Sequence, residues 1–228
     1  MPDFTFPAET FAFLEGIAAN NAKTWFEANR ALYEKGYVEA GKAFVTELGP
    51  RLREISPSVQ FDPRVNGSIG RINRDIRFSK DKRPYKTHLG MWFWHGEKKG
   101  WDKPGFWFGI TPEHLQLGTG WWGFPKDALD EFRQSVIHPR SGKALVAAVE
   151  AVKAKGPYEI GGKTRKLLPK GFSTDPDRQE YLLYEGLHTY LELPVAAARS
   201  PGLIDLCLEH SANAWPINKW LLDEGIGQ

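Results

Sequence analysis

The fold is decided by three short aromatic stretches, THLGMWFWH (residues 87–95), GFWFGI (residues 105–110) and HLQLGT (residues 114–119). Aromatic side chains favour the pleated, half-buried surface of a β-strand, so each stretch predicts a strand. TPE (residues 111–113) makes a tight link between the second and third stretches, and residues 96–103 make a longer hairpin loop. The three stretches therefore predict an antiparallel meander at the centre of the fold.

On the N-terminal side of these strands, the apolar residues recur at the spacing of helices. Pro7 suits the first turn of a helix that carries Phe11 and Leu14 on one face. We predict a second helix that ends near Gly36 and a third that closes before Pro57. One face of the second helix carries Trp25, Phe26, Asn29, Leu32 and Tyr33, and one face of the third carries Tyr37, Ala40, Phe44, Leu48 and Leu52.

Further elements are predicted on either side of the meander. A strand runs from Ser68 to Asn73, and helical spacing returns after Trp122. Ser141 is the expected N-cap of one later helix, and Asp175-Pro176 begins another that carries Tyr184. Helices around a single antiparallel sheet make this an α+β protein. We predict one domain over residues 1–228, helical over 1–56, with the sheet and a basic motif over 57–122, and mostly helical over 123–228.

Composition places the chain among ordinary globular proteins. It has 228 residues, of which 41% are apolar and 25% charged. Cys207 is the only cysteine, so no intrachain disulfide can form, which fits a reducing compartment. The first twenty residues lack the pattern of a secretory signal, and no apolar run is long enough to cross a bilayer. We expect a cytoplasmic protein with no membrane partner.

The positive charge of the chain is concentrated in one segment, RINRDIRFSKDKRPYKTH (residues 71–88). This segment has a net charge of +5 whereas the whole chain has +2, so the remainder sums to −3. Such a concentration predicts either an anion site or a loop that is held in place by ion pairs.

Arg71, Arg74 and Arg77 recur at every third residue, with Asp75 between the last two. A guanidinium group presents planar pairs of donors that match the oxygens of a phosphate or carboxylate. In a helix the three arginines would share one side. In a strand Arg74 would instead fall on the apolar face and need a partner. Both geometries can bring two arginines to one anion, but Asp75 and another acid could equally neutralise them.

The second half of the segment, from Lys80 to Lys86, has the composition of an exposed basic loop. It stands next to the tryptophan-rich strands, and cations beside aromatic faces suit single-stranded nucleic acid or nucleotide bases. The aromatic runs are continuous, however, so alternate residues must face opposite sides of the sheet and one face must be core.

Motifs that would identify a particular chemistry are missing from the sequence. The six histidines show no metal-ligand spacing, so we predict no metal site, and no phosphate-binding loop or nucleophile elbow occurs. The sequence identifies no cofactor. Asp75 and Tyr85 are the candidates for moving a proton, and Ser79 and His88 are further proton carriers of the same segment.

The basic segment resembles the defining motif of a bacterial family known as domain of unknown function 2461. The resemblance covers nearly the whole chain, and the family's proteins are about this length. It implies a family signature but no activity, ligand or catalytic residue. The matching residues of the motif are Arg71, Arg74, Asp75, Arg77, Phe78, Asp81, Lys82 and Tyr85, and the flanking matches are Trp25-Phe26, Asn29-Arg30, Tyr33, Pro169-Lys170-Gly171-Phe172 and Glu180-Tyr181-Leu182.

Three hypotheses follow for the function of the motif. The first is a pocket for a small phosphate- or carboxylate-bearing molecule, a nucleotide being one candidate, formed by Arg71, Arg74, Arg77, Lys82 and Tyr85. At least two of the three arginines would then converge in one cleft. The second is a nucleic-acid-binding module that uses the loop from Lys80 to Lys86. We expect such binding to be weak, because the rest of the chain is negatively charged. The third is a scaffold in which the motif is only an ion-pair latch.

Overall fold

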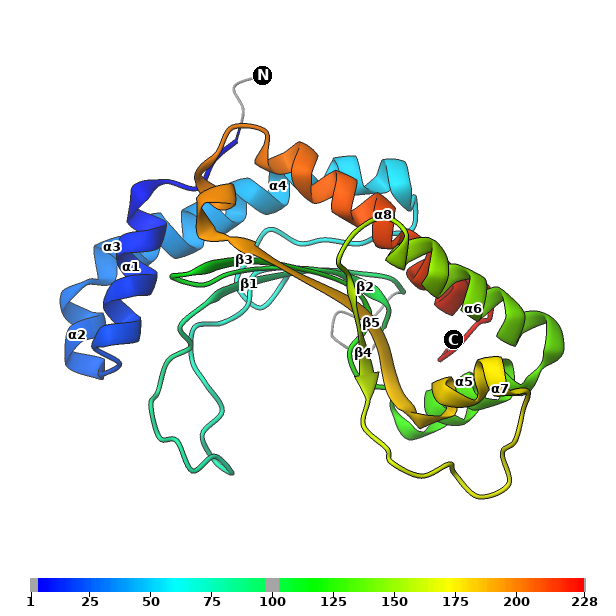
Figure 1. Ribbon diagram of the computed structural model, residues 1–228. Helices are drawn as coiled ribbons and strands as arrows, with labels where there is room; N and C mark the ends of the chain where they lie inside the picture. Colours follow the sequence, from blue (N-terminus) through cyan, green and yellow to red (C-terminus); the bar gives the residue numbers. More distant parts are fainter. Residues whose placement is uncertain (1–3, 97–102, 228) are drawn as a thin grey trace. The chain divides into compact units, whose positions relative to one another are not determined.

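The computed structural model describes residues 4–96 and 103–227, so the loop predicted over residues 96–103 falls almost wholly outside the described residues. It confirms the α+β class: helices accompany a five-stranded antiparallel sheet with strand order β1-β2-β3-β5-β4 (Figure 1). The predicted aromatic meander is formed by β1, β2 and β3. The strands are β1 (Leu89–Trp94), β2 (Gly105–Ile110), β3 (His114–Trp121), β4 (Glu159–Lys163) and β5 (Tyr184–Pro194).

The contacts divide the chain into two compact units, each assembled from three separate segments. The single domain predicted for residues 1–228 stays a prediction. Unit 1 consists of Met1–Phe93, Trp107–Leu117 and Glu192–Leu208, and unit 2 consists of Trp94–Phe106, Gly118–Leu191 and Glu209–Gln228.

The N-terminal helices belong to unit 1, and the predicted end of a helix at Gly36 is wrong. Gly36 lies inside a π-helical segment that continues directly into the next α-helix. A Cβ atom at this position would lie 2.4 Å from the Glu9 carbonyl oxygen, and Thr10 donates a 2.6 Å hydrogen bond to the Gly36 carbonyl. This glycine therefore permits close helix contact instead of ending a helix. The elements are α1 (Ala8–Ala19), α2 (Lys23–Ala28), α3 (Arg30–Tyr33), η1 (Glu34–Glu39) and α4 (Ala40–Ile55).

One face of the unit 1 strands packs on α4 (Figure 1). Phe44 of α4 meets Phe108 of β2 with ring centroids 5.6 Å apart, and Phe93 of β1 meets the same ring at 5.6 Å. All three phenylalanines are buried. Because side chains alternate along a strand, the opposite face of the same strands carries Gly90 and Trp107.

The predicted strand from Ser68 to Asn73 is wrong as a regular strand. Isolated bridges occur at Ile69 and Asn73, and the Gly70 N–H donates a 2.9 Å hydrogen bond to the Gly90 carbonyl. After this contact the chain leaves the sheet as a two-sided arm, residues 72–85, which extends away from β1 (Figure 1). Asn73 and Tyr85 pair across the arm, and the Arg74 N–H donates to the Pro84 carbonyl at 2.9 Å.

In unit 2, the sequence predicted helices but placed some of their ends wrongly. Ser141 is not an N-cap; His138 is, and its Nδ1 accepts from the Ser141 N–H at 3.4 Å. The helix expected to carry Tyr184 ends earlier, because β5 begins at that residue. Trp220 Nε1 donates to the Ser141 carbonyl at 3.0 Å and so fastens α8 to α6 within the unit.

The later helices are α5 (Lys126–Ile137), α6 (Pro139–Lys153), α7 (Pro176–Gln179) and α8 (Leu203–Asp223), with 3-10 turns η2 (Glu180–Leu183) and η3 (Val195–Arg199). None of the helices in the described part of the chain combines the length and the apolar character needed to span a membrane.

Candidate anion-binding site at the root of the arm

The arm holds its own shape through ion pairs between its arginines and aspartates. Asp75 accepts from Arg77 Nε at 3.0 Å and from Nη2 at 2.7 Å. Asp81 is shared: it pairs with Arg74 Nη1 at 2.8 Å and with Arg83 Nη2 at 2.8 Å. These hydrogen bonds lower the pKa of both aspartates, chiefly through Arg77 for Asp75 and Arg83 for Asp81. Asp75 and Asp81 therefore neutralise arginines of the segment, which is the alternative that the sequence left open for Asp75 and another acid.

The root of the arm is fastened to the N-terminal helices of unit 1. Tyr85 is buried and stacks on Phe26 of α2 with ring centroids 4.6 Å apart and an interplanar angle of 21°. The side-chain amide of Asn21 bonds both backbone groups of Tyr85, donating to the carbonyl and accepting from the N–H, each at 3.0 Å. On the outgoing side, the Tyr37 hydroxyl of η1 donates to the Gly70 carbonyl at 2.8 Å. Both sides of the arm thus begin from fixed positions.

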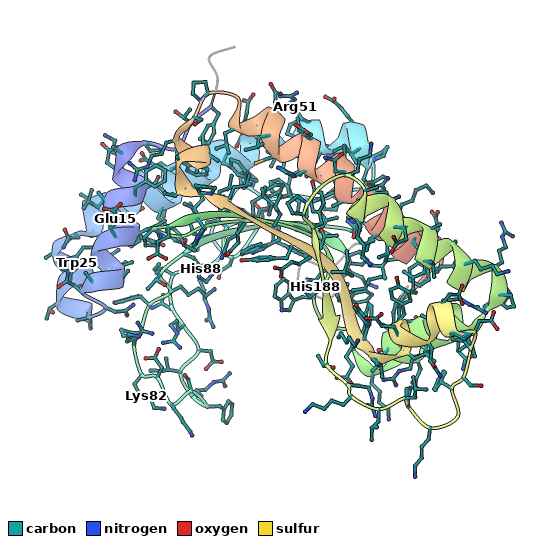
Figure 2. The ribbon with its side chains drawn as sticks, in the orientation of Figure 1. Glu15, Trp25, Arg51, Lys82, His88 and His188 are labelled. Atoms are coloured by element: carbon teal, nitrogen blue, oxygen red, sulfur yellow. The ribbon has the colours of Figure 1, made fainter. Side chains whose placement is uncertain are left out.

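A bulge lies between this root and the sheet. The Gly70 N–H bonds to the Gly90 carbonyl, and the Lys86 N–H bonds to the Ile72 carbonyl. The outgoing side therefore advances two residues, from Gly70 to Ile72, where the returning side advances four, from Lys86 to Gly90. Bulges bend a strand and redirect its side chains, and they are over-represented next to active sites. Here the bulge contains Lys86 and His88, and Figure 2 shows His88 at the sheet end of the arm, with Lys82 at the far end.

Gly70 and Gly90 form a bare patch of backbone beside the bulge, which we call the glycine floor. Ile69 and Met91 pair across the two segments, so Gly70 and Gly90 are the next cross-strand neighbours on the opposite face. A Cβ atom on Gly70 would lie 3.8 Å from Lys86 Nζ. The Gly90 Cβ position lies 3.5 Å from Trp107 Nε1 and 3.7 Å from His88 Nε2. Three nitrogen-bearing side chains therefore surround the floor.

We call Arg71, Lys86 and His88 the cationic cluster, because the charge of Arg71 acts on Lys86 and the charge of Lys86 acts on His88. Burial and the charge of Arg71 lower the pKa of Lys86. Burial and the charge of Lys86 lower the pKa of His88. In residues 4–96 and 103–227, no carboxylate is hydrogen-bonded or ion-paired to any member of the cluster. The segment's two aspartates are held by Arg74, Arg77 and Arg83, and Arg71 acts on Asp75 only through its charge.

The structure brings together only part of the predicted ligand-binding set. The charge of Arg71 lowers the pKa of Lys86, whereas Arg74 and Arg77 contact different carboxylates in the arm. Lys82 Nζ donates to the Ile76 carbonyl at 3.0 Å, within the arm. Tyr85 has its ring packed on Phe26, so the two proton-transfer candidates, Asp75 and Tyr85, occupy an exposed ion pair and a buried stack respectively.

Sequence reasoning placed Lys86 in an exposed loop and missed the glycine floor and Trp107. The available signal was the pair of glycines, Gly70 and Gly90, each inside a stretch predicted as a strand. A glycine inside a strand pattern marks a bulge or a close approach of a ligand or another backbone. Metal-binding side chains do not gather in threes or more anywhere in the described ranges.

The flanking residues of the resemblance occupy structural positions in their own units. In unit 1, Phe26 contacts Tyr33, with ring centroids 5.1 Å apart, and forms the surface on which Tyr85 stacks. In unit 2, Phe172 lies under the buried Arg133 guanidinium, 5.8 Å from its Cζ, and Leu182 is fully buried. The flanking residues Phe26, Tyr33, Phe172 and Leu182 therefore pack within their own units.

Comparison with known proteins supports the family expected from the motif. No curated protein matches the chain. A family model described as conserved hypothetical protein (DUF2461) matches residues 9–220, which span the arm, the glycine floor and the helices of both units. The chain belongs to this DUF2461 family of conserved hypothetical proteins.

Proposed function

We propose that this protein binds a small phosphate- or carboxylate-bearing molecule at the cationic cluster, above the glycine floor. One observation carries the proposal: Lys86 and His88 lie at bare backbone, with the charge of Arg71 acting on Lys86, while both aspartates of the segment are engaged elsewhere. An anion with several oxygens would accept hydrogen bonds from these groups and offset their mutual repulsion.

The indole of Trp107 adds a neutral donor to the same place. Its Nε1 lies 3.5 Å from the Gly90 Cβ position, and no hydrogen bond of the indole N–H to another described residue is present. The glycines leave the space that a side chain would otherwise fill, so an anion can approach the backbone closely. This arrangement suits one bound anion of limited size.

Nucleic-acid binding by the loop from Lys80 to Lys86 is the alternative hypothesis. The observation in its favour is Phe78, which is 95% exposed beside the cations of the arm. Against it, Arg83 is paired with Asp81 and Lys82 is bonded to the Ile76 carbonyl. Few free cations are left to neutralise phosphates, so we expect weak binding with a shallow dependence on salt.

The proposal is tested by isothermal titration calorimetry with pyrophosphate at low salt. Lys86→Met should weaken binding by about tenfold or more, because a charge-assisted hydrogen bond contributes on the order of 1.5–3 kcal/mol. Arg77→Met is the matched control: it removes one positive charge from the same segment, but from a side chain held by Asp75. We expect it to change the affinity by less than about twofold.

Two outcomes would contradict the proposal. If Lys86→Met and Arg77→Met lose affinity equally, pyrophosphate binding depends only on the net charge of the segment. Tight binding of a single-stranded oligonucleotide, with a steep salt dependence that is lost on neutralising Lys80 and Lys82, would favour the nucleic-acid hypothesis instead.

A further inference from the structure

The side chain of Trp107 lies along its own strand instead of standing away from the sheet. The Cβ position of Gly109, two residues further along β2, lies 2.4 Å from Cη2 and 2.7 Å from Cζ2 of the indole. Two ring atoms therefore occupy the space that a side chain at residue 109 would need. The indole nitrogen lies beside Gly90, so the ring extends from the glycine floor toward Gly109.

Within the described part of the chain, no ring or guanidinium covers this indole. Its neighbour Phe108 faces the core and packs against Phe44 and Phe93. Trp107 is half-buried, and among the described residues no aromatic ring or guanidinium packs on it. A tryptophan that leans over glycine backbone turns a broad apolar face outward, which suits stacking with a planar ring.

Gln116 limits what can lie on that face. Its Nε2 donates to Glu192 Oε1 at 2.7 Å, which leaves Oε1 as the group turned toward the indole, 3.0 Å from the Gly109 Cβ position. An acceptor at the edge of an aromatic face suits an amino group on a planar ring.

We propose that the anion bound at the cationic cluster is joined to a planar, amino-bearing ring, as in an adenine nucleotide, and that this ring stacks on Trp107. The inference rests on the proposed function, since the cationic cluster must first hold the phosphate. It adds the class of ligand, which Trp107, Gly109 and Gln116 indicate.

The experiment compares AMP, ribose 5-phosphate and pyrophosphate by calorimetry on the full-length protein. We expect AMP to bind about tenfold or more tightly than ribose 5-phosphate, because stacking on an aromatic side chain gives gains of this size. Trp107→Leu should abolish this ratio, and Trp107→Phe should retain most of it. Gly109→Ala should also reduce the ratio, because the new methyl group displaces the indole from its place.

Trp122→Leu is the matched control, since Trp122 is 56% exposed and its ring already stacks on His188 with centroids 4.0 Å apart. The AMP ratio should be unchanged in this variant, and circular dichroism checks that every variant is folded. Equal affinities for AMP and ribose 5-phosphate, both lost in Lys86→Met, would overturn the stacking inference and leave the proposed function standing. Failure of all three compounds to bind the parent protein would overturn both.

Discussion

His188 illustrates how the position of a single residue sets its chemistry. It lies in β5, is 8% exposed, and stacks on Trp122 with ring centroids 4.0 Å apart. Burial lowers its pKa to about 4, against an ordinary value of 6.5. His88 in unit 1 is also below its ordinary pKa, but there the charge of Lys86 adds to burial. His188 stays neutral because it is buried, whereas the pKa of His88 can respond to a bound anion.

His188 should make the protein less stable in acid. A histidine whose pKa is lowered on folding binds its proton more readily in the unfolded chain. The resulting stability is fully present above pH 6.5 and is lost as the pH falls toward about 4. A shift of this size corresponds to about 3 kcal/mol in the free energy of unfolding. Urea unfolding of the parent and of His188→Gln at a series of pH values measures this loss.

The His188→Gln variant should lose less stability than the parent between pH 6.5 and 4. Its free energy of unfolding will still fall with pH, because other histidines contribute. His88, His95 and His210 also have lowered pKa values and act in the same direction. Identical pH dependence in parent and variant would show that His188 is not the residue responsible.

The structure of the arm could be predicted only in part from the sequence. Its charge and its aspartates were visible in the sequence, and the Asp75–Arg77 pair follows from their spacing. The bulge at Lys86 could not be predicted, because register depends on pairing between residues that are not adjacent in sequence. The later strands were missed for a related reason: β4 reads EIGGK, with two glycines and little β-forming signal. Tertiary pairing with β5 makes it a strand.

Asn21 should matter more to the arm than the arm's own ion pairs do. Asn21→Ala removes two hydrogen bonds to the Tyr85 backbone and leaves that N–H without its partner. We expect a loss of about 2 kcal/mol in the free energy of unfolding, together with faster hydrogen exchange at the Tyr85 amide. Asp75→Ala is the control: its ion pair with Arg77 is exposed, so stability should stay near that of the parent. The reverse ranking of the two variants would mean that ion pairs hold the arm.

For the molecule as a whole, the sequence predicted the fold class and the central strands best. The α+β class and the three-stranded meander follow from the change in apolar spacing, and both are confirmed. The two compact units could not be read from the sequence, because each is assembled from three segments with no linker between them. Only some residues of the candidate site could be read from the sequence. Arg71 belongs to it, whereas the partners of Arg74 and Arg77 depend on how the arm folds back.

The pKa of His88 reports whether an anion binds at the cationic cluster. Its imidazole can be titrated by NMR with and without saturating pyrophosphate, with His88→Gln to assign the signal. The His210 imidazole, bonded through Nδ1 to the Tyr158 hydroxyl, serves as the internal control. A bound anion would offset the charge of Lys86, so we expect the pKa of His88 to rise on binding while that of His210 stays constant. Bound pyrophosphate that leaves the pKa of His88 unchanged would contradict the proposal.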